Sequence, residues 1–132
     1  MQLMISLLTL GLFMSPALAH DGHGNVRGAV AASNGGVVHA TENFYLEVVA
    51  RMDGIEIYPF DHDNHPIAPS EMKINGNALV PRTNKSLPVS FAPAGKALAS
   101  KVDAKDARQY TLELTVSHAG KSETIRLNVG PL

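Results

Sequence analysis

The chain contains no cysteine and no tryptophan. The absence of cysteine excludes disulfide bonds, thiolate metal ligands and a lipid-modified N-terminal cysteine. Histidine, methionine, carboxylate or amine groups would therefore have to hold any bound metal. With three Tyr and four Phe in 132 residues, the chain also has few rings on which a carbohydrate-binding module could stack sugars.

The chain has little excess charge of either sign. Eleven basic and twelve acidic side chains give a formal net charge of −1, which argues against nucleic acid or an anionic membrane as the main partner. Catalytic signatures are also lacking, since we find no nucleophile elbow, zinc-protease motif or phosphate-binding loop. We therefore predict a protein that is not an enzyme and does not bind nucleic acid.

Residues 1–19 have the pattern of a cleaved secretory signal. An apolar stretch runs from Leu3 to Met14, Ser15-Pro16 interrupts it, and Ala17-Leu18-Ala19 supplies the small-x-small pattern that signal peptidase accepts. The apolar stretch is shorter than the roughly 20 residues that a membrane span needs. We expect a periplasmic or secreted protein that begins at His20 and has no membrane span after cleavage.

The rest of the chain is long enough for one small domain. Residues 20–36, rich in Gly, Ala, Asn and Ser, predict a flexible lead-in with a short strand at Val26–Val30. Residues 37–132 predict the domain itself, and Asp53-Gly54 is its strongest hairpin signal because Gly takes the positive φ of a tight turn. Strands are expected at 37–40, 44–51, 55–60, 71–74, 78–80, 86–91, 96–100, 109–117 and 124–129.

Alternation within these runs predicts which side chains face the core. In residues 44–51, one face carries Phe44, Leu46 and Val48 and the other carries Tyr45, Glu47 and Val49. Short strands joined by Gly, Pro, Asn and Asp turns are typical of an all-β, antiparallel β-sandwich. We predict about seven strands in an immunoglobulin-like or cupredoxin-like sandwich, with a small closed barrel as the alternative.

The expected N-terminus is one candidate metal site. His20 would offer its α-amine and its ring nitrogen in one chelate, a pairing that suits copper. His23 could add a further nitrogen, although it does not occupy the third position that the tight amine–amide–amide–imidazole chelate needs. A loose polar terminus without metal is the alternative interpretation.

The polar segment Asp61-His62-Asp63-Asn64-His65 is the second candidate metal site. His62 and His65 offer imidazole nitrogens and Asp63 an oxygen, which are suitable ligands for Cu(II), Zn(II) or Ni(II). An ordinary solvated turn, in which Asp and Asn bond to nearby backbone, is the alternative. Copper is the metal we expect first, with zinc or nickel as alternatives.

The region from Gly35 to Ile67 resembles a group of small exported domains found with heavy-metal efflux and copper-resistance systems. The resemblance lies in Gly35-Gly36-Val37-Val38, Tyr45–Val49, Gly54–Tyr58 and the turn Asp61–Ile67. It implies a periplasmic β-sandwich that binds or accompanies metal export, with the N-terminal histidines as ligands and an envelope efflux complex as a partner.

Two departures from this group argue against a high-capacity metal buffer. Such domains often have a His just before the Gly-Gly step, where this chain has Asn34, and the lead-in holds two histidines rather than a dense tract.

Our first hypothesis is a periplasmic metal-binding accessory protein that holds or hands over copper. The alternative is a metal-free immunoglobulin-like interaction or chaperone module of the cell envelope, which would dock through an exposed edge strand.

Overall fold

The computed structural model describes residues 31–81, 83, 85–102 and 108–130. These residues form nine β-strands and one short 3-10 helix, η1 (Pro69–Glu71). The strand predicted at Val26–Val30 lies outside them. The strands are β1 (Val37–Ala40), β2 (Tyr45–Arg51), β3 (Gly54–Phe60), β4 (Met72–Val80), β5 (Lys85–Ser90), β6 (Ala92–Ala94), β7 (Ala97–Lys101), β8 (Tyr110–His118) and β9 (Lys121–Val129).

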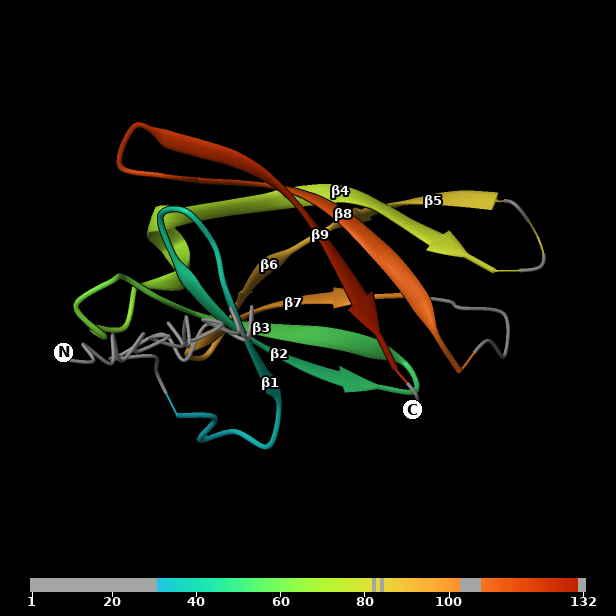
Figure 1. The fold of residues 1–132 in the computed structure, drawn as a ribbon, viewed down its shortest axis with the longest axis horizontal. Coiled ribbons are helices and arrows are strands. Elements are labelled where there is room, and N and C mark those ends of the chain that lie inside the picture. The colour runs from blue at the N-terminus through green and yellow to red at the C-terminus, as the bar shows by residue number, and fades with distance from the viewer. Residues whose placement is uncertain (1–30, 82, 84, 103–107, 131–132) are drawn as a thin grey trace, which may run out of the picture.

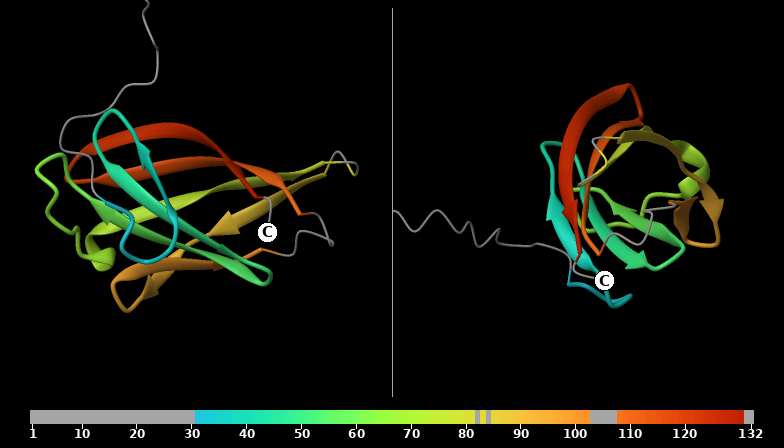
Figure 2. Two further views of the ribbon diagram at one scale, coloured as in Figure 1. Left: turned by 60° about the horizontal axis from the view of Figure 1, so that its bottom comes forward. Right: turned by 90° about the vertical axis from the view of Figure 1, so that its right-hand side faces the viewer.

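The strands make two antiparallel sheets that face each other (Figures 1 and 2). One sheet has five strands in the order β1-β2-β3-β7-β6, and the other has four in the order β5-β4-β8-β9. The predicted all-β antiparallel sandwich is confirmed. The described residues form nine strands where about seven were predicted, and the short edge strand β6 was not among the expected ranges.

The β2–β3 hairpin was predicted correctly, but its turn was assigned to the wrong residues. The register pairs Arg51 with Gly54, so Met52 and Asp53 form the turn and Gly54 belongs to β3. Gly54 does not have positive φ. Its lack of a side chain matters for another reason, since a Cβ there would lie 2.5 Å from the Ser100 carbonyl oxygen on β7. This glycine lets two neighbouring strands approach closely.

Strand β4 corrects a second expectation. Separate strands were predicted at 71–74 and 78–80, because Asn75-Gly76-Asn77 has the composition of a turn. These three residues instead continue the strand and pair with both β5 and β8. The prediction failed because strand pairing on both sides overrides the local turn preference of Asn and Gly.

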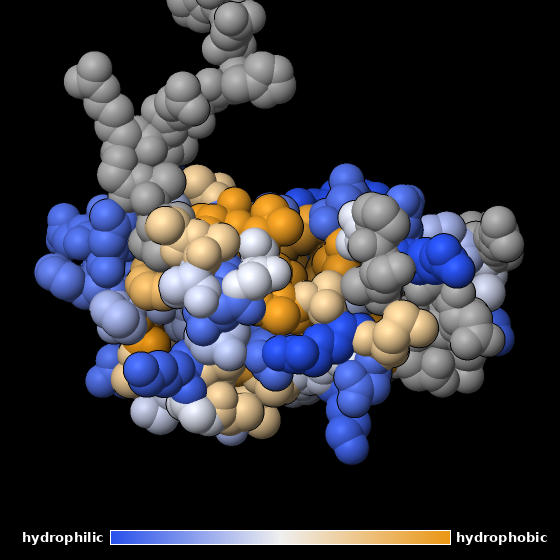
Figure 3. Space-filling view, turned by 90° about the horizontal axis from the view of Figure 1, so that it is seen from below, coloured by the Kyte–Doolittle hydropathy of each residue, from blue (hydrophilic) through white to orange (hydrophobic). Residues whose placement is uncertain are grey.

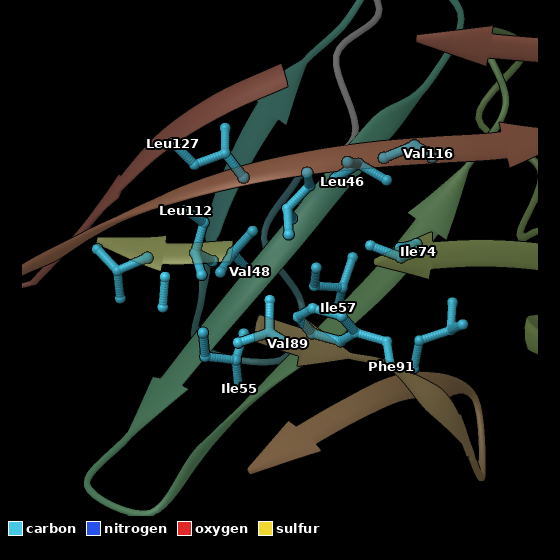
Figure 4. Packing of buried hydrophobic residues seen from close by; sticks show 14 of the residues in the cluster. Leu46, Val48, Ile55, Ile57, Ile74, Val89, Phe91, Leu112, Val116 and Leu127 are labelled. Carbon is cyan, nitrogen blue, oxygen red and sulfur yellow. The ribbon is translucent and has the colours of Figure 1, made fainter. Parts of the chain in front are cut away.

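The core lies between the inner faces of the two sheets. Side chains from both sheets interleave there, including Leu46 and Ile57 from one sheet and Ile74 and Leu112 from the other (Figure 4). Side chains of β8 alternate between the core and the outer face, and Tyr110, Leu112, Leu114 and Val116 are all buried. With no disulfide, this apolar packing is the main source of stability.

The hydroxyl oxygen of Tyr110 is buried and has no hydrogen-bond partner among the described residues. Burial raises the pKa of Tyr110 to about 12. Because an unpaired buried hydroxyl stabilises nothing, Tyr110→Phe should leave the free energy of unfolding within about 1 kcal/mol of the parent or raise it. Denaturant unfolding of both proteins measures this, and a loss above about 2 kcal/mol would show that the hydroxyl is hydrogen-bonded.

Candidate metal site

Three connections lie together at one end of the sandwich, at the left of Figure 1. They are the β1–β2 loop (residues 41–44), the β3–β4 loop (residues 61–68) and the β8–β9 turn (residues 119–120). The sequence-predicted segment Asp61–His65 forms the exposed part of the β3–β4 loop. The candidate site is therefore on a surface held by strand ends rather than on a free tail.

The β3–β4 loop is closed by its own backbone. The Asp61 N–H donates to the His65 carbonyl at 2.9 Å, and the Asn64 N–H donates to the Asp61 carbonyl at 3.1 Å. Asn64 takes φ 65°, a left-handed conformation that asparagine tolerates better than most residues. Beyond the loop, the Ile67 N–H donates to the Pro59 carbonyl at 3.0 Å and the Ile67 side chain is buried. These contacts define the geometry of residues 61–65.

This geometry brings Asp61, Asp63 and His65 together. Each offers one ligand atom, and these atoms all lie within 4.8 Å of one another. The His65 Nδ1 is 3.5 Å from the Asp61 Oδ2. Two carboxylates and one imidazole, all solvent-accessible, can ligate a divalent cation and leave positions open for water or another donor.

Asp61 both shapes the loop and belongs to the ligand group. Its Oδ1 accepts hydrogen bonds of 2.9 Å from the N–H groups of Asp63 and His65. The His65 N–H, with further help from the Asp63 N–H and the His65 ring, lowers the pKa of Asp61 below its ordinary value. The carboxylate form is therefore the one that this loop favours. Asp61 was not among the ligands chosen from the sequence, although an Asp that opens a turn is the usual signal for such a double acceptor.

His62 is not brought into this group. Its Nε2 lies 3.2 Å from the Thr41 carbonyl oxygen, and its ring packs 5.0 Å from the Tyr45 ring at an interplanar angle of 41°. These contacts connect the β3–β4 loop to the β1–β2 loop. The structure therefore separates the two histidines that the sequence placed in one site.

The two other described histidines, His39 and His118, lie on strands. The His118 Nδ1 lies 3.0 Å from the Glu71 carbonyl oxygen, and the ring meets Phe44 edge to face at 6.0 Å. His39 is a half-buried residue on β1, and burial lowers its pKa.

The segment before β1 is attached to the outer face of β2 through Glu47. The Glu47 carboxylate accepts hydrogen bonds from the Asn34 N–H at 2.8 Å, the Asn34 side chain at 2.9 Å, the Gly36 N–H at 3.1 Å and the Ser33 N–H at 3.4 Å. Glu47 is fully buried even though it lies on the face opposite the core. We call this arrangement the Glu47 clasp. Asn34, at the position where the similar domains often have a histidine, is thus a hydrogen-bond donor to Glu47.

The chain matches no family model, no curated protein and no solved structure. The resemblance noted in the sequence therefore stays an expectation. His20 and His23 lie outside the described residues. Among the described residues, no helix has the length and apolar character needed to cross a membrane.

Proposed function

We propose that this protein is a periplasmic or secreted metal-binding accessory protein that holds a divalent cation on the β3–β4 loop and hands it over. The observation that carries the proposal is the convergence of Asp61, Asp63 and His65 within 4.8 Å on an exposed loop. Copper is the first choice of metal, with zinc and nickel as alternatives. The proposal includes no catalytic step, and an envelope efflux complex is the proposed receiver of the ion.

The ligand set supports exchange better than permanent storage. Three protein donors leave coordination positions open, and all three side chains are reached from solvent. The loop backbone and the Asp61 hydrogen bonds hold the donors before the ion arrives, which lowers the entropic cost of binding. His20 and His23 remain predicted ligands of a terminal site, and the experiment below separates them from the loop.

Titration of the protein with Cu(II), Zn(II) and Ni(II), followed by calorimetry and, for Cu(II), by electron paramagnetic resonance, tests the proposal. His65→Ala and Asp63→Ala should each weaken binding by at least about tenfold, because each removes one of three ligands. His62→Ala is the matched control, since it deletes an adjacent imidazole that contacts Thr41 and Tyr45 instead. It should change the affinity by less than about threefold.

The N-terminal site is tested by comparing protein that begins at His20 with protein that carries one extra N-terminal Met. If the extra Met abolishes binding and His65→Ala does not, the metal is held by the terminus and the loop proposal is wrong. If neither form binds any of the three ions, the metal-binding function itself is overturned.

A further inference from the structure

The two sheets of the sandwich are open along one side, between edge strands β1 and β9. β1 ends the five-stranded sheet and β9 ends the four-stranded sheet, and among the described residues they do not pair with each other. Two hollows of about 510 and 530 Å³ lie between them, and His39 lines both. We call the two hollows together the β1–β9 trough.

The trough is lined by both polar and apolar residues, and its core-facing side chains are mainly apolar. Figure 3 views the face that carries β1, and hydrophobic side chains gather there around a recess near its middle. Val37 of β1 is 63% exposed although it points toward the core side of its sheet, opposite Val48. The lining residues that matter are Val37 and Val48 from one sheet and Ile125, Leu127 and Val129 from the other.

β9 is also the longest edge strand of the two sheets. Proteins discourage pairing at edge strands by making them short or by placing proline or lysine on them. β1 has 4 residues, β6 has 3 and includes Pro93, and β5 begins with Lys85 and includes Pro88. β9 also begins with a lysine, but it has 9 residues without proline or glycine, and its free edge borders the trough. A strand that pairs with β9 would direct alternate side chains into the trough.

Glu123 determines which kind of side chain a partner would need at this edge. Its Oε2 accepts hydrogen bonds from the Asn43 side chain at 2.8 Å and the Asn43 N–H at 3.2 Å. Its Oε1 is buried and has no hydrogen-bond partner among the described residues. A buried oxygen of this kind needs a donor, and a cationic side chain is the strongest one available. Glu42 and Arg126 line the same hollow, and Arg126 already pairs with Glu113.

The sequence of β9 argues against a second copy of the chain as the occupant. Lys121 is the cation that β9 carries on the same face as Glu123. Consider a two-fold antiparallel pair of β9 strands from two copies. If Lys121 of one copy lies directly opposite Glu123 of the other, only residues 121–123 of each strand pair. If Lys121 lies diagonal to Glu123, only residues 121–125 of each strand pair. Neither arrangement uses the length of the edge. The occupant is therefore better supplied by another polypeptide.

We propose that the β1–β9 trough is a docking site for an extended segment of a partner protein, which adds a strand to β9, fills the trough with alternate apolar side chains and places a lysine or arginine on Glu123. An inward-facing carboxyl on an edge strand opposes generic pairing, so Glu123 also selects among partners. This function uses residues other than Asp61, Asp63 and His65 and does not depend on metal binding.

The probe is a pair of nine-residue peptides of alternating Val and Thr, with one Lys near the N-terminus in the first and near the C-terminus in the second. Matched peptides carry Gln in place of Lys. We expect one Lys peptide to bind the full protein and to slow hydrogen exchange of alternate β9 amides at least about tenfold. Its Gln counterpart should bind about tenfold more weakly, and Glu123→Gln should abolish this preference.

Variants on the two walls of the trough locate the site. Val37→Lys and Ile125→Lys should each weaken peptide binding at least about tenfold by placing a charge in the apolar lining. Met52→Lys, at an exposed apolar residue of the β2–β3 turn that does not line the trough, should leave peptide binding unchanged. Val37 is exposed, so its variant keeps the test valid even if Ile125→Lys fails to fold.

Three outcomes would overturn the proposal. The first is that neither Lys peptide binds, or that binding survives Val37→Lys. The second is slow hydrogen exchange of alternate β9 amides in the protein without peptide, which would show that another segment of the same chain occupies the trough. The third is a concentration-dependent dimer in sedimentation equilibrium that Ile125→Lys dissociates, which would assign the face to a second copy.

Discussion

Gly76→Ala should destabilise the fold by about 3 kcal/mol or more. A Cβ built at Gly76 would lie 1.9 Å from the carbonyl oxygen of Glu113 and 2.9 Å from the Cα of Leu114, both on the backbone of β8. A flexible side chain could move away, but this backbone is paired on both sides in the four-stranded sheet. β4 and β8 would therefore have to separate locally, with loss of ladder hydrogen bonds and core packing.

Denaturant unfolding of Gly76→Ala, beside Asn77→Ala as the control, measures this effect. Asn77 neighbours Gly76 on β4 but its side chain is exposed, so its replacement should cost less than about 1 kcal/mol. Equal, small losses for both variants would show that the two strands can move apart at little cost. The thermal midpoint of Gly76→Ala should fall in parallel with its unfolding free energy.

Glu47→Ala is the second change with a large expected effect, about 3 kcal/mol at neutral pH. The Glu47 carboxylate is buried and accepts four hydrogen bonds from Ser33, Asn34 and Gly36. Truncation leaves these donors without their acceptor and opens a void beside Val49, which the clasp covers. Glu47→Gln keeps the shape and part of the bonding, so its cost should be about 1 kcal/mol.

The same residue predicts a pH dependence of stability. Burial by itself raises the pKa of Glu47, but the hydrogen bonds from Asn34, Gly36 and Ser33 outweigh it and hold this pKa below its ordinary value. Because the pKa is lower in the folded than in the unfolded state, the unfolded chain binds the proton first on acidification. The stabilisation is therefore complete above the unfolded pKa and is lost as the pH falls through the folded pKa.

Thermal unfolding of the parent and Glu47→Gln between pH 7 and pH 3 checks this sign, with the unfolded pKa near 4.3 as the reference. The stability difference between the two proteins should shrink as the pH falls below that value. Asp61, whose pKa is also lowered, contributes equally to both proteins and cancels in the difference. A difference that stays constant or grows toward pH 3 would contradict the clasp.

Much of the candidate site follows from short spacing in the sequence. Asp61, Asp63 and His65 lie within five residues, and a turn of that length cannot separate its side chains far. Which of these side chains group together was harder to predict, because adjacent side chains in a turn point to different sides. The contacts of His62 are with Thr41 and Tyr45, which come from other strands and connections, and local sequence does not specify those neighbours.

The short strands, the turns between them and the alternation of side chains indicated an antiparallel sandwich and the side chains that face its core, because a strand has a period of two and one face must leave water. Only the tertiary structure decided what covers the opposite face and which strands become edges. Glu47 is buried by a segment 13 residues away, and Glu123 receives its hydrogen bonds from Asn43, 80 residues away. Such pairings depend on strand order and sheet twist, which arise from packing of the whole chain, so the Glu47 clasp and the β1–β9 trough could be found only in the folded molecule.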